Sequence, residues 1–361
     1  MPRVFGLDLL RCVAVLMVLL AHTRFFLRPV LPQAQALSIF GFLGVELFFV
    51  LSGFLIGGIA LRDFSTGEGG ASLRAFWIRR WFRTLPNYYL FLALNAVLTA
   101  SLGGEGQGGS LAYVLFLQNL AWPAPPFFNE SWSLAVEEWF YLLFPLVTVL
   151  LMRLGLEMRK AVLGALGTLL VLATTARVLG VLTGTPSWDD GVRKVVLFRL
   201  DALMVGVLGA CLSAYWPQLW TRLRGPSVLL GTVLFAAVFW VYFSVARNGS
   251  IFARTLLFPV TSVAVLAFLP ALSQWREAAG SLATTVRNLS LWSYSLYLTH
   301  LPVRQILISA FGDPESPTST LGTSATLFLC AAFVAISIAS AAFVYRFYER
   351  PMTALRERFA R

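Results

Sequence analysis

An arginine and a histidine share one face of the first long apolar segment, residues 7–27. The 11-residue step from Arg11 to His22 turns a helix by about 1100°, so the two side chains differ by only about 20°. Asp8 lies on the same face, and the step advances about 16 Å along the axis. Because histidine can take and give a proton near neutral pH, this face could carry acid–base or nucleophilic chemistry. In the structural alternative, Arg11 snorkels to one interface and His22 caps the other.

The other titratable candidates lie deeper in the chain. His300 is the second of two histidines, and a lone histidine on an apolar face is more often a satisfied core residue than a functional one. Glu137 and Glu138 are adjacent, so they point about 100° apart on a helix, and one could face a bundle interior. Their structural alternative is a pair of acidic residues near a helix N-terminus, which complement its dipole.

Charged residues inside apolar segments cost several kcal/mol, so each of them needs a reason. Glu46, Arg199 and Asp201 are such residues, and with His300 we treat them as candidate substrate-binding groups. Arg199 and Asp201 are two positions apart and would not face each other on a helix, so each is expected to find its partner on another helix.

A basic group consists of Arg79, Arg80 and Arg83. Guanidinium forks suit phosphate oxygens, so these residues could bind a phosphorylated ligand. The alternative is the general excess of cations in the cytoplasmic loops of membrane proteins.

The composition indicates which fold must position these residues. Of 361 residues, 58% are hydrophobic and 12% charged, whereas soluble domains are about 25% charged. Because a soluble fold cannot hide so much apolar surface, the sequence predicts an all-α integral membrane protein, a multi-pass protein of the cell membrane in contact with lipid. The three cysteines have no C-x-x-C spacing, so no metal site is expected.

We expect a bundle of about ten transmembrane helices, because the apolar stretches are about 20 residues long. The predicted spans are 7–27, 38–60, 84–101, 131–152, 161–182, 195–214, 227–245, 254–272, 289–310 and 321–345. With the N-terminus inside, eighteen of the 28 Lys and Arg residues fall on cytoplasmic segments, six outside and four within spans. This bias predicts that both termini are cytoplasmic, and it explains the net charge of +11 without nucleic acid.

Two segments between the predicted spans need their own interpretation. Residues 111–122 are apolar but too short to cross, so we expect a re-entrant or interfacial piece on the outer face. Residues 74–83 alternate arginines with aromatic side chains, which predicts a helix lying in the membrane interface.

Seven motifs in order make the sequence resemble the membrane-bound acyltransferase family 3, whose members O-acylate bacterial surface sugars and some secondary metabolites. The motifs are residues 6–11 with His22, 44–56, 79–86, 131–141, 198–202, 294–300 and 345–351. Glu46 stands where the family most often has aspartate, so the negative charge is kept. The resemblance implies one membrane domain over residues 1–361, without the hydrolase-like soluble domain that some members carry.

The resemblance also implies a reaction, in which an acyl group moves from acyl-CoA, with acetyl-CoA as the expected donor, to a hydroxyl of a carbohydrate or glycosylated acceptor. The family's functional positions map onto Arg11 and His22, onto Arg80 and Arg83, and onto Glu137 and Glu138.

In this scheme Arg80 and Arg83, together with Arg79, hold the donor phosphates. His22 is a general base or an acyl-carrying nucleophile, and a glutamate of the pair orients or charge-balances its imidazole. The sequence leaves direct transfer and an acyl-histidine intermediate open.

Other functions remain as alternatives. Intramembrane ionisable residues also mark substrate pathways, so a secondary transporter or flippase of a glycan or glycolipid is the main rival, although no inverted repeat is visible. A cytoplasmic-side O-acyltransferase of a glycosylated small molecule and a non-catalytic polysaccharide-export partner are the others.

Overall fold

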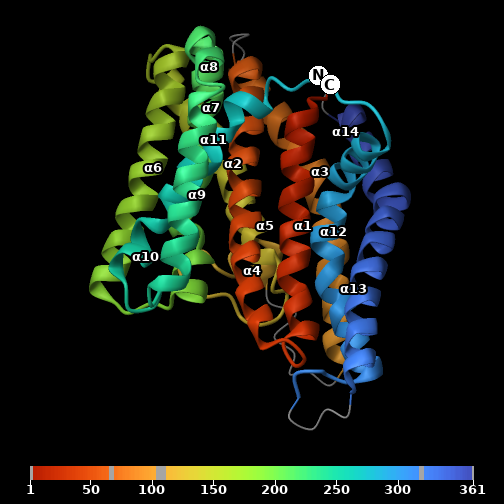
Figure 1. Ribbon diagram of the computed structural model, residues 1–361. Coiled ribbons are helices and arrows are strands. Elements are labelled where there is room, and N and C mark those ends of the chain that lie inside the picture. The colour runs from red at the N-terminus through yellow and green to blue at the C-terminus, as the bar shows by residue number, and fades with distance from the viewer. Residues whose placement is uncertain (1–2, 65–68, 103–110, 317–320, 360–361) are drawn as a thin grey trace.

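The computed structural model describes residues 3–64, 69–102, 111–316 and 321–359. Every regular element in these residues is helical, as predicted (Figure 1). The long helices are α1 (Phe5–Leu27), α2 (Ser38–Asp63), α3 (Gly69–Ser101), α5 (Ser131–Arg153), α6 (Met158–Thr183), α7 (Leu200–Tyr215), α9 (Pro226–Ser244), α11 (Leu257–Leu272), α12 (Ser281–Phe311) and α13 (Thr323–Val344). The short elements are η1 (Pro32–Leu37), α4 (Leu111–Val114), η3 (Trp188–Arg193), η4 (Val196–Phe198), α8 (Pro217–Arg222), α10 (Ile251–Thr255), η5 (Tyr345–Glu349) and α14 (Arg350–Phe359).

Among the described residues, six helical stretches are long and apolar enough to cross a membrane. They are Phe5–Leu27, Pro32–Asp63, Ser131–Arg153, Met158–Thr183, Pro226–Ser244 and Thr323–Leu355. α7 and α11 are apolar but only 16 residues long. Each of the ten predicted spans coincides with a long helix, but length and composition support six of them, so the number ten stays a prediction.

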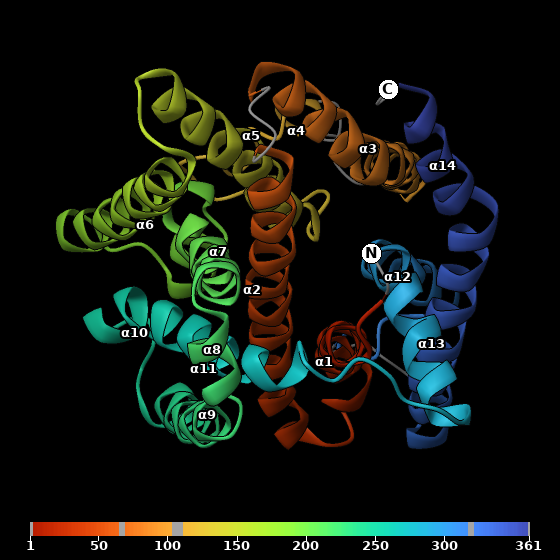
Figure 2. The ribbon, with the colours of Figure 1, turned by 90° about the horizontal axis from the view of Figure 1, so that it is seen from above.

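Seen along the bundle, α2 runs through the middle (Figure 2). α6, α7, α9 and α11 lie on one side of it, and α1, α12 and α13 lie on the other. α2 packs most extensively against α7 and next against α1. The two chain ends lie at the same end of the bundle (Figure 1), which agrees with the predicted topology, whereas their cytoplasmic location stays a prediction.

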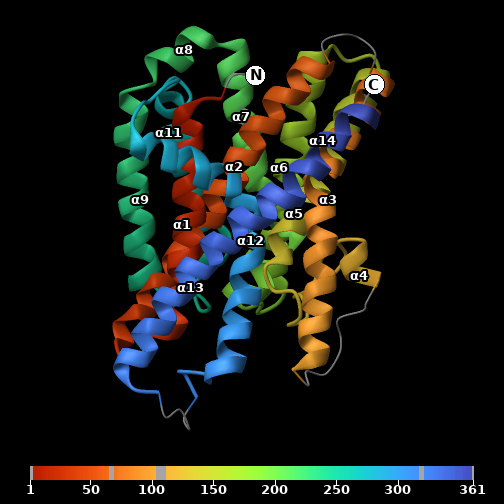
Figure 3. The same cartoon turned by 90° about the vertical axis from the view of Figure 1, so that its right-hand side faces the viewer.

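The predicted interfacial helix at residues 74–83 is not a separate element. These residues continue into the following apolar segment as the single 33-residue helix α3, with Pro86 inside it (Figure 3). Proline has no N–H to donate to the carbonyl four residues earlier in a helix. Two tyrosine hydroxyls from other elements bond different carbonyls close to Pro86. Tyr294 Oη donates to the Thr84 carbonyl at 2.8 Å, and Tyr348 Oη donates to the Pro86 carbonyl at 3.2 Å.

Residues 111–122 do not form a spanning helix, as predicted. They contain the four-residue helix α4 and then irregular chain beside α3 (Figure 3). Asn119 Nδ2 donates to the carbonyl oxygens of Trp132 and Lys194 at 3.0 and 2.6 Å, and the amide of Val196 donates to the Asn119 carbonyl at 2.9 Å. The segment therefore ties the start of α5 to the chain that leads into α7.

Two glycines allow α2 and α7 to approach closely. A Cβ atom added at Gly53 would lie 2.0 Å from the carbonyl oxygen of Leu203, and one added at Gly206 would lie 2.2 Å from that of Val50. Small residues serve this purpose in membrane helix pairs, where close backbone packing replaces the hydrophobic driving force.

We expect Gly53→Ala to destabilise the protein by about 1–3 kcal/mol or more, because the new methyl group would force α2 away from α7. The matched control is Gly58→Ala on the same helix, where an added Cβ meets nothing within 4 Å and helix propensity favours alanine by about 0.5–1 kcal/mol. Thermal unfolding of the two purified variants measures the difference. Equal midpoints would contradict the close packing at Gly53.

Candidate active site

α1 carries both residues of the first candidate pair. The helix is unbroken from Phe5 to Leu27, so the rise of about 16 Å between Arg11 and His22 applies as expected. Nδ1 of His22 lies 2.8 Å from the carbonyl oxygen of Val18. A carbonyl oxygen can only accept a hydrogen bond, so Nδ1 carries the proton in this contact. Nε2 is then the nitrogen with a lone pair available for chemistry.

The two histidines of the chain meet between α1 and α12. The ring centroids of His22 and His300 are 4.7 Å apart, at an interplanar angle of 68°. His300 is 1% exposed, yet neither ring nitrogen has a hydrogen-bond partner among the described residues. The backbone carbonyls of Leu296 and Tyr297 lie near the ring without meeting hydrogen-bond geometry. His300 thus lies buried beside His22, and its substrate-binding role stays a prediction.

A polar chain that the sequence analysis did not single out leads from His300 to the start of α5. The rings of Tyr297 and His300 are 5.8 Å apart, and Tyr297 Oη lies 2.6 Å from Ser133 Oγ. Tyr297 Oη also donates to the Glu130 carbonyl at 3.2 Å. Ser133 and Tyr297 both stand in motifs of the resemblance, so a signal for them was present in the sequence.

Glu130 precedes α5 and is 4% exposed. Its Oε1 atom has no hydrogen-bond partner among the described residues. Burial raises the pKa of this carboxyl to about 8. No charge pattern in the sequence separates Glu130 from an ordinary loop glutamate, so only its packed surroundings identify it.

Glu137 lies in the interior, with its carboxylate turned towards basic residues. It accepts hydrogen bonds from Ser52 Oγ at 2.8 Å and from Tyr141 Oη at 2.7 Å. Arg83 and Arg11 interact with it electrostatically. Glu137 therefore faces the bundle interior. Glu138 is buried as well, and the functional role of the pair stays a prediction.

Glu138 points to the same end of the bundle, where Thr84 and Arg80 are its neighbours. Neither glutamate hydrogen-bonds to His22 in the described part of the chain, and the expectation that one of them orients or charge-balances the imidazole stays a prediction. Axial position accounts for the missing hydrogen bond among the described residues. α5 begins at Ser131, so Glu137 and Glu138 lie about 10 Å further along the helix. They are therefore distant from the start of α5, where Ser133 belongs to the polar chain that leads to His300.

The three predicted phosphate-binding arginines are not equivalent. Arg79 is ion-paired with Asp63 at 2.5 Å, whereas Arg80 and Arg83 interact with the glutamates of α5. Residues from three helices thus gather at one end of the bundle, and we call them the arginine–glutamate cluster: Arg11 from α1, Arg80 and Arg83 from α3, and Glu137 and Glu138 from α5.

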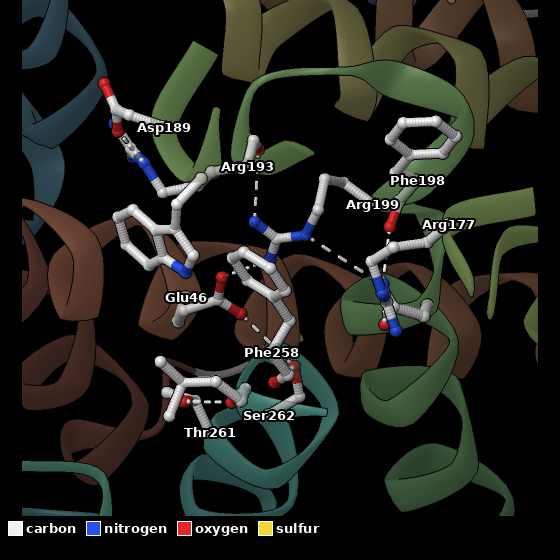
Figure 4. Close-up of polar contacts among 12 residues, drawn as sticks. Glu46, Arg177, Asp189, Arg193, Phe198, Arg199, Phe258, Thr261 and Ser262 are labelled. Atoms are coloured by element: carbon white, nitrogen blue, oxygen red, sulfur yellow. Dashed lines mark hydrogen bonds and ion pairs between the residues drawn. The ribbon is translucent and has the colours of Figure 1, made fainter. Parts of the chain in front are cut away.

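The candidates Glu46, Arg199 and Asp201 belong to a different site, a sealed ion-pair network with Arg177 (Figure 4). Arg199 pairs with Glu46 on α2, and Arg177 Nη1 on α6 lies 2.6 Å from Asp201 Oδ2. Ser262 Oγ on α11 donates to Glu46 Oε2 at 3.2 Å. These four charged side chains are 0–1% exposed. They contact one another in this structure, and the substrate-binding role expected of Glu46, Arg199 and Asp201 stays a prediction.

The expectation that Arg199 and Asp201 find partners on other helices is confirmed. They also lie 3.9 Å apart, which the helix rule did not allow. Arg199 precedes α7 with φ −125° and ψ 1°, so helical spacing does not apply to it. Arg177, a single cation within a predicted span, was a visible signal that the sequence analysis left unused.

Comparisons with known proteins place the chain as a whole. A family model described as an acyltransferase domain matches residues 4–343. The chain is 30% identical over 334 residues to the Bacillus subtilis protein named "Putative peptidoglycan O-acetyltransferase YrhL", covering 82% of this chain and 48% of that protein. It is 24% identical over 328 residues to the peptidoglycan O-acetyltransferase OatA of Listeria monocytogenes, covering 82% and 49%.

A "Putative O-acetyltransferase" of Staphylococcus aureus strain COL is 26% identical over 376 residues, or 96% of this chain and 56% of that protein. The chain therefore spans about half the length of these curated relatives. No solved structure matches it significantly.

The sealed ion pairs predict a large effect of one isosteric change. Asp201→Asn leaves the Arg177 charge without its buried partner and should cost about 3–5 kcal/mol of stability. The control is Asp190→Asn, whose ion pair with Lys194 has a similar 2.7 Å separation but a carboxylate that is 61% exposed. It should cost about 0–1 kcal/mol. Similar losses in thermal unfolding would show that burial does not set the strength of the Arg177 pair.

Glu130 predicts a pH dependence of stability. Its carboxyl binds a proton up to about pH 8 in the folded protein, but only to about pH 4.5 when unfolded. The folded state therefore holds more protons in this window, and stability should fall as pH rises through it. Glu130→Gln should lower this slope of unfolding temperature against pH, whereas Glu157→Gln, at an exposed carboxylate, should not. A Glu130→Gln slope equal to that of the wild type would refute the buried neutral carboxyl.

Proposed function

The chain belongs to the acyltransferase 3 family, and on this premise we propose that it transfers an acyl group, in the first instance acetyl, from acyl-CoA to a hydroxyl of a carbohydrate acceptor. The observation that carries the proposal is the arrangement along α1. The arginine–glutamate cluster surrounds Arg11 near one end, and the His22–His300 pair lies about 16 Å further along the helix.

The donor belongs at the end that carries Arg80. CoA is rich in phosphate, and guanidinium groups bind phosphate oxygens in bidentate fashion. Arg80 and Arg83 have this chemistry, whereas Arg79 is already held by Asp63. Glu137 and Glu138 limit the repulsion among the arginines while the donor is absent. A thioester carried on the pantetheine arm would then extend past Arg11 towards His22.

The reacting group in this proposal is Nε2 of His22. As a general base, it takes the proton of the acceptor hydroxyl while the oxygen attacks the thioester carbonyl and the CoA thiolate leaves. As a nucleophile, it first takes the acyl group itself and then passes it to the acceptor. Both routes need the proton on Nδ1, where the Val18 carbonyl oxygen holds it.

The acceptor class rests on the relatives. Two of them are named for the O-acetylation of peptidoglycan, which supports a glycan as the acceptor. Because His22 and the arginine–glutamate cluster lie towards opposite ends of the bundle, we propose that donor and acceptor enter from opposite membrane faces. A protein that takes both substrates from the Arg80 face is the competing possibility.

Sealed proteoliposomes of known orientation test this proposal. With acetyl-CoA confined to the face carrying Arg80, and soluble peptidoglycan fragments to the other face, the wild type should form acetylated product. His22→Ala should lose activity by about 10²–10⁴-fold, the usual contribution of a proton-transfer group, with an unchanged unfolding temperature. Product that forms only when both substrates share the Arg80 face would instead indicate a one-sided tailoring enzyme. Near-normal turnover by folded His22→Ala would remove the histidine from the chemistry.

A further inference from the structure

Two arginines stack on one phenylalanine next to His22. The guanidinium carbons of Arg24 and Arg304 lie 4.2 and 3.9 Å from the ring centroid of Phe25. The same ring lies 5.9 Å from the imidazole of His22. Arg24 follows His22 on α1, and Arg304 is one turn beyond His300 on α12.

The charged and titratable groups that act most strongly on His22 are His300, Arg24 and Arg304. All three are bases. A histidine that works with a carboxylate would have an acidic neighbour, and this one is instead flanked by two positive charges on its outer side. The arrangement is therefore suited to a negative group that arrives with a substrate.

Two of the three acidic residues that act on these arginines already have ion-pair partners. Glu315 acts on both arginines but lies 3.2 Å from Arg28. Asp189 acts on Arg24 but is ion-paired with Arg193 at 2.6 Å and with Lys194 at 2.8 Å.

Within the described residues, neither Arg24 nor Arg304 has an ion-pair partner within 4.0 Å. Asp313 acts on Arg304 only at longer range, and the Arg304 Nε atom is buried without a hydrogen-bond partner. The two guanidinium groups repel each other, and acidic groups such as Glu315 act on them without forming an ion pair, so neither arginine is held by a direct carboxylate contact.

A purely structural role explains the position of Arg24 but not that of Arg304. Arg24 lies in the last turn of α1 and donates to the Ala21 carbonyl at 2.8 Å, which is a favourable place for a cation. Arg304 lies seven residues before the end of α12 at Phe311, where the helix dipole offers it little.

We propose that Arg24 and Arg304 form an anion clamp, which holds a carboxylate or phosphate group of the acceptor so that a nearby hydroxyl faces His22. This inference rests on the proposed function and narrows its acceptor to acidic glycans. Two guanidinium groups can bind such an anion through several charge-assisted hydrogen bonds. The Phe25 ring supports the two arginines that stack on it.

Binding of sugar probes in the absence of acyl-CoA tests the clamp. Three probes differ in one group only: methyl glucoside, methyl glucuronide with its carboxylate, and methyl glucoside 6-phosphate. Purified protein in nanodiscs should bind the two charged probes about tenfold or more tightly than the neutral one, the worth of a charge-assisted hydrogen bond. Arg304→Gln should abolish this preference, and Arg304→Lys should keep part of it.

Arg247→Gln is the matched control, because Arg247 also stacks on an aromatic ring, 4.0 Å from the centroid of Tyr242, but is not among the groups that act most strongly on His22. It should leave the preference intact. Equal binding of all three probes, no binding of either charged probe, or an equal loss in Arg247→Gln would overturn the clamp. The clamp would also be overturned if Arg304 binds a lipid headgroup instead. In that case Arg304→Gln would change how the unfolding temperature depends on the lipid headgroup in the nanodisc, and it would leave the probe preference unchanged.

The binding assay separates this proposal from the reaction itself. His22→Ala should keep the preference for charged probes, because the clamp does not include His22. If transfer from acyl-CoA fails but the preference persists, the proposed reaction is wrong and the anion site stands. If transfer proceeds equally well to neutral and acidic sugars, the clamp is wrong and the reaction stands.

Discussion

The buried pairing of Arg199 with Glu46 and of Arg177 with Asp201 is the constraint on which the rest of the bundle depends. Ions of this kind lose several kcal/mol of hydration when they leave water, and only a close partner offsets that loss. The four side chains come from α2, α6, α7 and the turn before α7, and Ser262 adds α11. A shift of any one of these helices would strand a charge, so the network fixes their relative positions.

The close contact at Gly53 and Gly206 makes this network geometrically possible. Without side chains at these positions, α2 and α7 approach until backbone meets backbone, which brings Glu46 within reach of Arg199. α2 then presents its other side to α1. The helix that carries Glu46 therefore also supports α1, the helix on which Arg11 and His22 stand.

The intramembrane polar groups fall into two kinds. In the Arg199 network every charge has an ion-pair partner within the described residues, although Arg177 Nε and Asp201 Oδ1 make no hydrogen bond there. Around α1, Arg24 and Arg304 have no ion pair within the described residues. An unpaired charge away from water costs free energy, so two such cations beside His22 are physically consistent with a site whose partners are substrates. The same distinction explains why charge within a span, by itself, does not identify a functional residue.

The sequence by itself determined the all-helical membrane character, the positions of the long helices and the alignment of Arg11 with His22, because each follows from local composition or from the pitch of one helix. It also determined the family, through motifs that need no knowledge of their spatial arrangement. Only the tertiary structure decided that His300 lies against His22, that Glu137 and Glu138 face the arginines, that α3 is continuous, and that Glu130 is buried. These depend on which faces of distant helices meet. Apolar faces of similar hydropathy can pair in many ways, and the choice among them is made by close packing at glycines and by the pairing of buried charges, neither of which hydropathy or spacing records.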